Sequence, residues 1–141
     1  MLNPFASMKG DHAAVRVPDL DVALLWFTEK LDFRVTDRWP FGDLRLAYVA
    51  PPVDTGFKIE LIAGPGASDR PGYEDLPSSL GVAGWHHVCF MVDSVDATVD
   101  ELRRRGVSIV AEPFDLPVIN RRLAFFGDPW GNLYELAQLL A

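Results

Sequence analysis

The stretch His12-Ala-Ala-Val-Arg-Val-Pro-Asp-Leu-Asp21 has a counterpart 75 positions later, His87-Val-Cys-Phe-Met-Val-Asp-Ser-Val-Asp96. Both stretches begin with a histidine, end with an aspartate and carry apolar residues at matching positions. The same offset places Gly56-Phe-Lys-Ile-Glu-Leu61 on Gly131-Asn-Leu-Tyr-Glu-Leu136, so that the glutamates of the two segments coincide. Each half of the chain thus contains a histidine followed 48 positions later by a glutamate. The repeat predicts two copies of one structural unit.

The first half reads as a strand, a helix and three further strands. Apolar and polar residues alternate over residues 12–17, as in a half-buried strand. Asp19 can cap a helix whose apolar residues recur at spacings of four, three and four. These residues are Leu20, Leu24, Phe27 and Leu31. Strands are then expected over residues 33–39, 44–50 and 57–63, separated by turn-forming residues.

The second half repeats this plan. The helix-facing side of its first strand is expected to consist of Val88, Phe90 and Val92, and Ser94 can cap the following helix. The apolar side of that helix consists of Val95, Val99 and Leu102. Gly106 is expected to end the helix. Three strands follow, near residues 107–111, 122–126 and 132–138.

The two modules are expected over residues 9–63 and 85–139 of a single domain, residues 1–141. Residues 64–84 between them are rich in glycine, proline and serine, which predicts a linker without regular structure. The linker is expected to act as a plain connector, although loops of this length also cover functional sites.

Composition indicates a cytoplasmic protein that binds neither nucleic acid nor membranes. Thirteen basic and twenty acidic residues give a net charge of −7, which disfavours nucleic acid and anionic lipid as partners. The longest apolar run, residues 22–27, is too short to span a bilayer, and the start of the chain does not resemble a secretory signal. Cys89 is the only cysteine, which excludes an internal disulfide and a cysteine-built zinc site.

Strand alternation places the repeated histidines and glutamates on the sheet face opposite the helix. His12 and Glu60 point away from the helix-facing side of their strands, as do His87 and Glu135. A carboxylate within so apolar a strand is costly unless it is paired or bound to a metal. A lone strand histidine is more often structural, but here four residues obey one repeat, and together they suit a divalent cation. His86 points to the other face and has no histidine counterpart, so it is not expected to be a ligand.

Four motifs carry a family resemblance: Leu31-Asp-Phe33, Ile59-Glu-Leu61, His86-His-Val-Cys-Phe90 and Asp128-Pro-Trp-Gly-Asn-Leu-Tyr-Glu-Leu136. Over residues 9–139 the chain resembles the vicinal oxygen chelate superfamily, also called the glyoxalase, bleomycin-resistance and dioxygenase superfamily. The resemblance implies an α+β fold of two βαβββ modules whose sheets form a cupped, incomplete β-barrel around a metal site. The metal ligands it implies are His12, Glu60, His87 and Glu135.

This set of ligands resembles that of glyoxalase I. The resemblance implies a lyase or isomerase, like lactoylglutathione lyase, with one divalent metal per site (Zn, Ni, Co, Mn or Fe). It implies proton movement next to a metal-chelated carbonyl through an enediolate, with Glu60 or Glu135 as the base and Glu135 slightly favoured. Two alternatives stay open: an Fe(II)-dependent ring-cleaving dioxygenase, and a non-catalytic drug- or toxin-binding resistance protein.

The resemblance also implies a small-molecule substrate, which could be a thiol adduct, and a homodimer. Arg16 matches an arginine that grips a glutathione carboxylate in glyoxalases, or else neutralises the two glutamates. Tyr48, Met91 and Arg122 are the other expected substrate contacts, with ordinary packing as the alternative. The chain departs from glyoxalase I after Leu61, which leaves the use of glutathione open. Cys89 lacks a free imidazole to activate it and is not expected to be a nucleophile.

Overall fold

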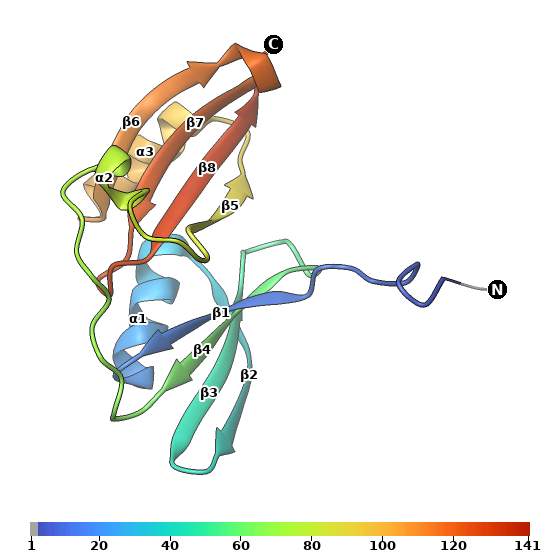
Figure 1. The fold of residues 1–141 in the computed structure, drawn as a ribbon, viewed down its shortest axis with the longest axis vertical. Helices are drawn as coiled ribbons and strands as arrows, with labels where there is room; N and C mark the ends of the chain where they lie inside the picture. Colours follow the sequence, from blue (N-terminus) through green and yellow to red (C-terminus); the bar gives the residue numbers. More distant parts are fainter. Residues whose placement is uncertain (1–2) are drawn as a thin grey trace. The chain divides into compact units, whose positions relative to one another are not determined.

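The computed structural model describes residues 3–141 and divides the chain into two compact units, Met1–Ala67 and Ser68–Ala141. Each unit contains one four-stranded sheet with a helix between its first and second strands (Figure 1). In both sheets the first strand lies beside the last, and the third and second strands follow in that order. The predicted α+β class and the two βαβββ modules are confirmed.

The first unit has a mixed sheet. Its elements are β1 (His12–Val17), α1 (Leu20–Leu31), β2 (Arg34–Phe41), β3 (Leu44–Ala50) and β4 (Lys58–Ala63). β1 lies parallel to β4, and β3 pairs antiparallel with both β4 and β2. β2 is an edge strand, a position that tolerates Pro40, which has no N–H to donate.

Helix α1 begins and ends at the residues that its sequence favours. The Oδ1 atom of Asp19 accepts a hydrogen bond from the backbone N–H of Val22 at 2.9 Å, as predicted for an N-cap. The helix stops at Asp32, whose φ of 55° is left-handed. The buried side of α1 consists of Leu20, Ala23, Leu24 and Phe27. Three of these belong to the predicted apolar stripe, which Ala23 joins in place of Leu31.

Alternation along β1 and β4 separates a buried face from a face that carries polar groups. The buried side chains of the sheet include Val15, Val17, Ala47, Val49, Ile59 and Leu61. Ala14 lies beside Glu60 in the parallel register, and Tyr48 lies beside Glu60 on its other side. Because alternate residues point to opposite faces, Glu60 lies on the face that α1 does not cover.

The prediction that residues 64–84 lack regular structure is wrong at one place. Helix α2 (Leu76–Ser79) forms a single turn there. Oδ1 of Asp75 accepts from the backbone N–H of Ser78 at 2.8 Å, and Oγ of Ser78 accepts from the N–H of Asp75 at 3.0 Å. This reciprocal capping, with Pro77 in the first turn, holds a helix that the Gly, Pro and Ser content of the linker concealed.

The second unit repeats the sheet of the first. Its elements after α2 are β5 (His87–Met91), α3 (Val95–Arg104), β6 (Ser108–Leu116), the 3₁₀ turn η1 (Pro117–Ile119), β7 (Arg121–Gly127) and β8 (Leu133–Leu139). β5 lies parallel to β8, and β7 pairs antiparallel with β8 and β6. β6 continues to Leu116 instead of ending near Ala111 as predicted. Its register shifts between Ala111 and Phe114, which accommodates Pro113 within the strand.

Helix α3 follows the predicted signals closely. Oγ of Ser94 accepts from the N–H of Ala97 at 3.1 Å, and Gly106, with φ of +81°, follows the end of the helix. Its buried residues are the three predicted ones, Val95, Val99 and Leu102.

The loop between β7 and β8 is built around Asp128. Oδ1 of Asp128 accepts from the backbone N–H groups of Trp130 and Asn132, each at 2.9 Å. Oδ2 accepts from Nδ2 of Asn132 at 2.8 Å and from the hydroxyl of Tyr134 at 2.9 Å. Burial raises the pKa of Asp128, and these hydrogen bonds oppose the rise. The loop thereby fixes the start of β8, whose third residue is Glu135.

No helix within residues 3–141 combines the length and apolar character needed to cross a lipid bilayer.

Candidate functional site

The first unit brings His12 and Glu60 together on the sheet face that α1 leaves uncovered. Nε2 of His12 lies 3.9 Å from Oε1 of Glu60, beyond hydrogen-bonding distance. The Glu60 side chain is only 16% exposed. Within residues 3–141, no lysine or arginine forms an ion pair with it. A half-buried carboxylate thus faces an imidazole nitrogen without a basic side chain to neutralise it.

Asp11 determines which nitrogen of His12 faces Glu60. Oδ2 of Asp11 lies 2.7 Å from Nδ1 of His12, and Nζ of Lys58 lies 3.3 Å from Oδ1 of Asp11. The hydrogen bond with His12, followed by that with Lys58, holds the pKa of Asp11 below its usual value, so the group is an ionised acceptor. Nδ1 of His12 must therefore donate, which leaves Nε2 of a neutral ring as a lone pair directed at Glu60.

Aromatic rings border this pair. The ring of Tyr48, a predicted substrate contact, lies 5.4 Å from the His12 ring, and Trp39 lies 4.7 Å from Tyr48 at a tilt of 60°. Nζ of Lys58 lies 4.8 Å from the centre of the Tyr48 ring. Tyr48 thus lies beside both members of the pair, because it is also the register neighbour of Glu60.

Arg16 is engaged with the backbone. Its guanidinium donates to the carbonyl oxygens of Val17, Ile62 and Pro65 at 2.6, 3.2 and 3.0 Å. Three carbonyl acceptors hold the charged group at the end of β1, and no ion pair joins it to Glu60 within residues 3–141.

The second unit contains the equivalent pair. Nε2 of His87 lies 3.6 Å from Oε2 of Glu135, whose side chain is again 16% exposed. Phe125 is the register neighbour of Glu135 on β7, and its ring lies edge-on to the His87 ring at 5.3 Å. Phe125 thus lies beside the histidine and glutamate of the second unit, as Tyr48 does in the first. The two aromatic residues are not related by the 75-residue offset of the repeat.

Cys89 lies beside Glu135 and is held as a thiol. The two residues are neighbours in the parallel register of β5 and β8. Partial desolvation, the hydrogen bond to Glu135 and the charge of that carboxylate raise the pKa of Cys89 to about 12. The thiol is therefore a donor to Glu135, and a thiolate nucleophile is not formed near neutral pH.

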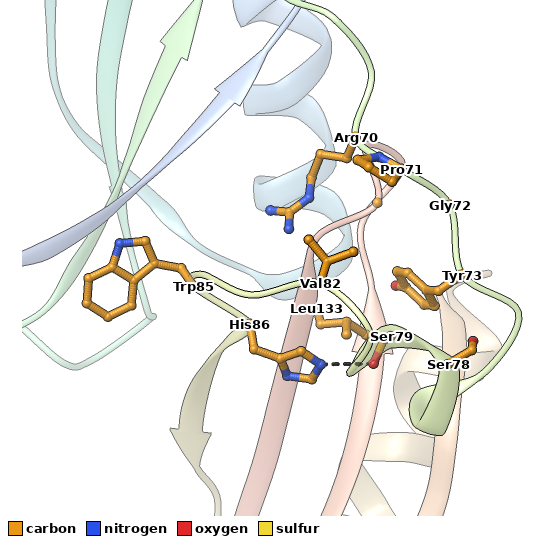
Figure 2. A pocket seen from close by; sticks show the side chains of 11 residues that line it. Arg70, Pro71, Gly72, Tyr73, Ser78, Ser79, Val82, Trp85, His86 and Leu133 are labelled. Atoms are coloured by element: carbon orange, nitrogen blue, oxygen red, sulfur yellow. Dashed lines mark hydrogen bonds between the residues drawn. The ribbon is translucent and has the colours of Figure 1, made fainter.

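His86, which is not among the predicted metal ligands, contacts His87. The two Nδ1 atoms lie 2.9 Å apart, and Nε2 of His86 lies 2.8 Å from Oγ of Ser79 on α2 (Figure 2). Sequence reasoning missed this role because it treated the position before a ligand only as a possible further ligand. The signal was present: position 86 corresponds by the repeat to Asp11, which holds His12 in the same way.

A small pocket adjoins His86, with a volume of about 50 Å³. Its walls include Arg70, Tyr73, Trp85 and Leu133, all from the second unit (Figure 2). This space suits a few water molecules and is far below the size of a site for a drug-sized ligand.

The two remaining predicted substrate contacts differ in placement. Met91 shares the face of His87 and is 56% exposed. Arg122 points the other way: its Nε and Nη2 bind both oxygens of Asp96 on α3 at 3.1 and 2.9 Å, and its Nη1 binds Asp115 at 2.8 Å. These contacts raise the pKa of Arg122. Arg122 thus joins α3 to the sheet and is not brought to the face that carries Glu135.

Within residues 3–141, no group of three or more His, Cys, Asp or Glu side chains is gathered closely enough to hold an ion. Each unit instead supplies one imidazole and one carboxylate, both of ligand type. Nitrogen and oxygen donors of this kind suit zinc, nickel, cobalt, iron or manganese.

Known proteins that are similar to this chain fall into several functional groups. The chain is 30% identical over 131 residues to the mitochondrial methylmalonyl-CoA epimerase of Bos taurus, covering 91% of this chain and 73% of that protein. It is 26% identical to the lactoylglutathione lyase of Schizosaccharomyces pombe, covering 93% of this chain but spanning only 47% of the yeast protein.

Among solved structures, TnmS3, an antibiotic-binding protein from Streptomyces sp. CB03234, superposes with a TM-score of 0.70 at 25% identity, covering 95% of this chain and 98% of that one. A sequence model of one family matches residues 9–136, nearly the whole chain. The chain belongs to the Glyoxalase/Bleomycin resistance protein/Dioxygenase superfamily.

Proposed function

We propose that this protein binds one divalent metal ion through His12, Glu60, His87 and Glu135 and transfers a proton at a carbon next to a carbonyl group of a small substrate. The proposal rests on one observation: in the first unit, Nε2 of His12 faces a carboxylate oxygen of Glu60. In a neutral His12 ring whose Nδ1 donates to Asp11, Nε2 carries a lone pair, and this atom lies 3.9 Å from Oε1 of Glu60.

Two acceptors in this arrangement repel each other unless a proton or a metal ion lies with them, and a metal ion can take both as ligands. Imidazole nitrogen and carboxylate oxygen are both common ligands of divalent transition metals, so the residues present fit such an ion. The recurrence of the same pair at 3.6 Å in the second unit supports a role for all four residues. The proposal holds equally for two pairs from one chain and for pairs from two copies in a homodimer.

When bound, the ion would act as a Lewis acid that stabilises negative charge developing on the substrate carbonyl oxygen. One glutamate takes the proton from the neighbouring carbon and returns it, as general base and then general acid. The family resemblance favours Glu135 for this step. Tyr48 and Phe125 are the register neighbours of the two carboxylates, so each glutamate has an aromatic residue beside it.

Two relatives support the class of reaction. An epimerase inverts one stereocentre, which a proton that leaves and returns can accomplish, and the bovine protein of that name is 30% identical to this chain. The relative from Schizosaccharomyces pombe is named lactoylglutathione lyase. We therefore propose a lyase or isomerase like lactoylglutathione lyase, with a carbonyl-containing thiol adduct as the substrate to be tested first.

A second candidate is binding of a drug or toxin without turnover. It is favoured by the likeness to TnmS3, whose chain is covered almost completely at 25% identity. The two candidates differ in outcome, since a binding protein returns its ligand unchanged.

The test begins with protein purified without a histidine tag or chelator, followed by elemental analysis and titration with Zn, Ni, Co, Mn and Fe(II). We expect one ion per set of four ligands, and turnover of hemithioacetals formed from a panel of thiols. Glu60→Gln combined with Glu135→Gln should abolish turnover, whereas Glu112→Gln, at an exposed site, should not change it.

Three results would overturn the proposal. They are an active double variant, the absence of any bound or titratable metal, and recovery of unchanged ligand after long incubation with metal-loaded protein. The last would establish the binding function. Oxygen consumption on a phenolic panel by the Fe(II)-loaded protein would instead indicate a dioxygenase.

A further inference from the structure

Three polar groups of the second unit form a continuous chain that ends at His87. Oγ of Ser79 lies 2.5 Å from the carbonyl oxygen of Leu76, and Nε2 of His86 lies 2.8 Å from the same Oγ. Nδ1 of His86 lies 2.9 Å from Nδ1 of His87. Figure 2 shows His86 directed at Ser79, which α2 places beside it.

The position of each hydrogen follows from the first contact. Two oxygen atoms 2.5 Å apart repel each other unless a hydrogen lies between them, and the carbonyl of Leu76 can only accept. The single hydroxyl hydrogen of Ser79 is therefore given to Leu76. Ser79 then has only lone pairs to offer at His86, so Nε2 of His86 must carry a hydrogen.

The hydrogen on Nε2 of His86 also fixes which nitrogen of each imidazole carries a hydrogen. A neutral imidazole has one N–H, so His86, which donates through Nε2, has an accepting lone pair at Nδ1. The contact between the two Nδ1 atoms then requires His87 to donate from Nδ1. Its Nε2 is left as a lone pair, 3.6 Å from Oε2 of Glu135.

We propose that His86 and Ser79 are positioning residues that hold His87 as the Nδ1–H tautomer and direct its Nε2 lone pair toward Glu135. The consequence for catalysis rests on the proposed function, in which Nε2 of His87 binds the metal. The tautomer itself is a property of the second unit without any ion. Helix α2, which carries Ser79, is on this view a support for the site as well as part of the linker.

The repeat supplies a second, independent observation. His86 occupies the position that Asp11 has in the first half, 75 residues earlier. Each of these residues contacts Nδ1 of the histidine that follows it, at 2.7 Å for Asp11 and 2.9 Å for His86. A carboxylate accepts unaided, whereas a histidine accepts at Nδ1 only if its own hydrogen is kept at Nε2. Ser79 keeps that hydrogen at Nε2 of His86. The two halves thus use different groups to accept a hydrogen bond from Nδ1 of the histidine that follows.

The test reads the tautomers directly in metal-free protein. The chain has only three histidines, so ¹⁵N-histidine labelling and long-range ¹H–¹⁵N correlation resolve each ring. Spectra are recorded at about pH 8.5, about two units above the ordinary histidine pKa of about 6.5. We expect a protonated Nδ1 for His87 and a protonated Nε2 for His86. Predominance of Nε2–H at His87 in the unmodified protein would overturn the proposal.

Variants separate positioning from general structural effects. His86→Leu removes the acceptor, and we expect His87 to shift toward Nε2–H. His86→Gln keeps an acceptor oxygen and a donor amide, and should restore much of the Nδ1–H form. Ser79→Ala frees His86 to exchange tautomers and should weaken the preference at His87, whereas Ser68→Ala in the linker should not. An unchanged His87 tautomer in His86→Leu would also refute the proposal.

A second readout links the tautomer to the ion. In competition titrations, His86→Leu should weaken metal affinity by about 10–100-fold, with His86→Gln intermediate. The experiments test the proposed function and the positioning role of His86 independently. The expected tautomers with no metal binding would refute the proposed function alone, and tight metal binding with the opposite His87 tautomer would refute the positioning role alone.

Discussion

The carboxylate of Asp11 accepts a hydrogen bond from Nδ1 of His12 at 2.7 Å, and this contact turns the other ring nitrogen toward Glu60. A carboxylate behind a ligand histidine fixes the tautomer and makes the ring a better donor to a metal. The contact depends on residues adjacent in the chain, so its effect can be measured with little disturbance of the fold.

Asp11→Ala is expected to weaken metal affinity by about 10–100-fold, because His12 loses the acceptor that holds its Nδ1 hydrogen. Asp11→Asn retains an acceptor oxygen and should lose less. Competition titration with a metal indicator measures both, with Asp69→Ala, an exposed linker position, as the control. Equal affinities in Asp11→Ala and the unmodified protein would show that Asp11 does not support His12.

Asp128 should make stability depend on pH in an unusual direction for a carboxylate. Its pKa is raised in the folded protein above the ordinary 3.8 because it is buried, so the folded state favours the protonated form. The free energy of unfolding should therefore rise as the pH falls from the pKa of the folded state toward 3.8. Above the pKa of the folded state, the carboxylate is ionised and its burial destabilises the protein fully. Urea unfolding of the unmodified protein and Asp128→Asn over this range should show a difference that shifts in favour of the unmodified protein as the pH falls. A constant difference would contradict this.

Removal of the Asp128 side chain has a larger effect than neutralising it. Asp128→Ala leaves the N–H groups of Trp130 and Asn132 and the hydroxyl of Tyr134 without their acceptor. We expect a loss of about 3 kcal/mol or more in unfolding free energy at neutral pH, since each of these buried donors costs about 1–3 kcal/mol when unsatisfied. A loss below about 1 kcal/mol would mean that water replaces the carboxylate.

Cys89 in the metal-free protein should resist alkylation. A thiol with a pKa of about 12 has about a thousandth of the thiolate of one with the ordinary value of 9.0, at any pH below both. Iodoacetamide at about pH 8 should therefore react about 1,000-fold more slowly with the folded protein than with the urea-unfolded chain. Glu135→Gln removes a charge that raises this pKa and should accelerate the reaction, whereas Glu112→Gln should not. Rapid alkylation of the folded, unmodified protein would contradict the prediction.

Arg122→Ala should lower the thermal midpoint while leaving metal affinity unchanged. The guanidinium joins Asp96 of α3 to Asp115 of β6 from its position on β7, and alanine removes all of these contacts. Arg122→Lys keeps the charge but lacks the planar fork, so it should recover only part of the midpoint. Thermal unfolding measures this, with Arg38→Ala on the exposed edge strand as the control. A raised KM with an unchanged midpoint would instead return Arg122 to the role of substrate contact.

Local signals account for most of the fold. The caps at Asp19 and Ser94 and the alternation in residues 12–17 depend on neighbours in the chain, and the structure has all three where they were expected. The helix at residues 76–79 was missed, because reciprocal capping by Asp75 and Ser78 outweighs a composition typical of loops. The length of β6 was missed as well, because an irregular register accommodates Pro113 inside the strand.

The sequence by itself determined the two modules, their repeat and the pairing of a histidine with a glutamate in each, because periodicity and spacing are properties of the chain alone. Only the tertiary structure decided which partners the side chains of Arg122 and Ser79 contact. Arg122 meets Asp96 across 26 residues, and Ser79 reaches His86 through a turn of helix that composition concealed. The direction of a side chain and the place of a hydrogen depend on which acceptors folding brings within about 3 Å, and sequence spacing does not contain that information.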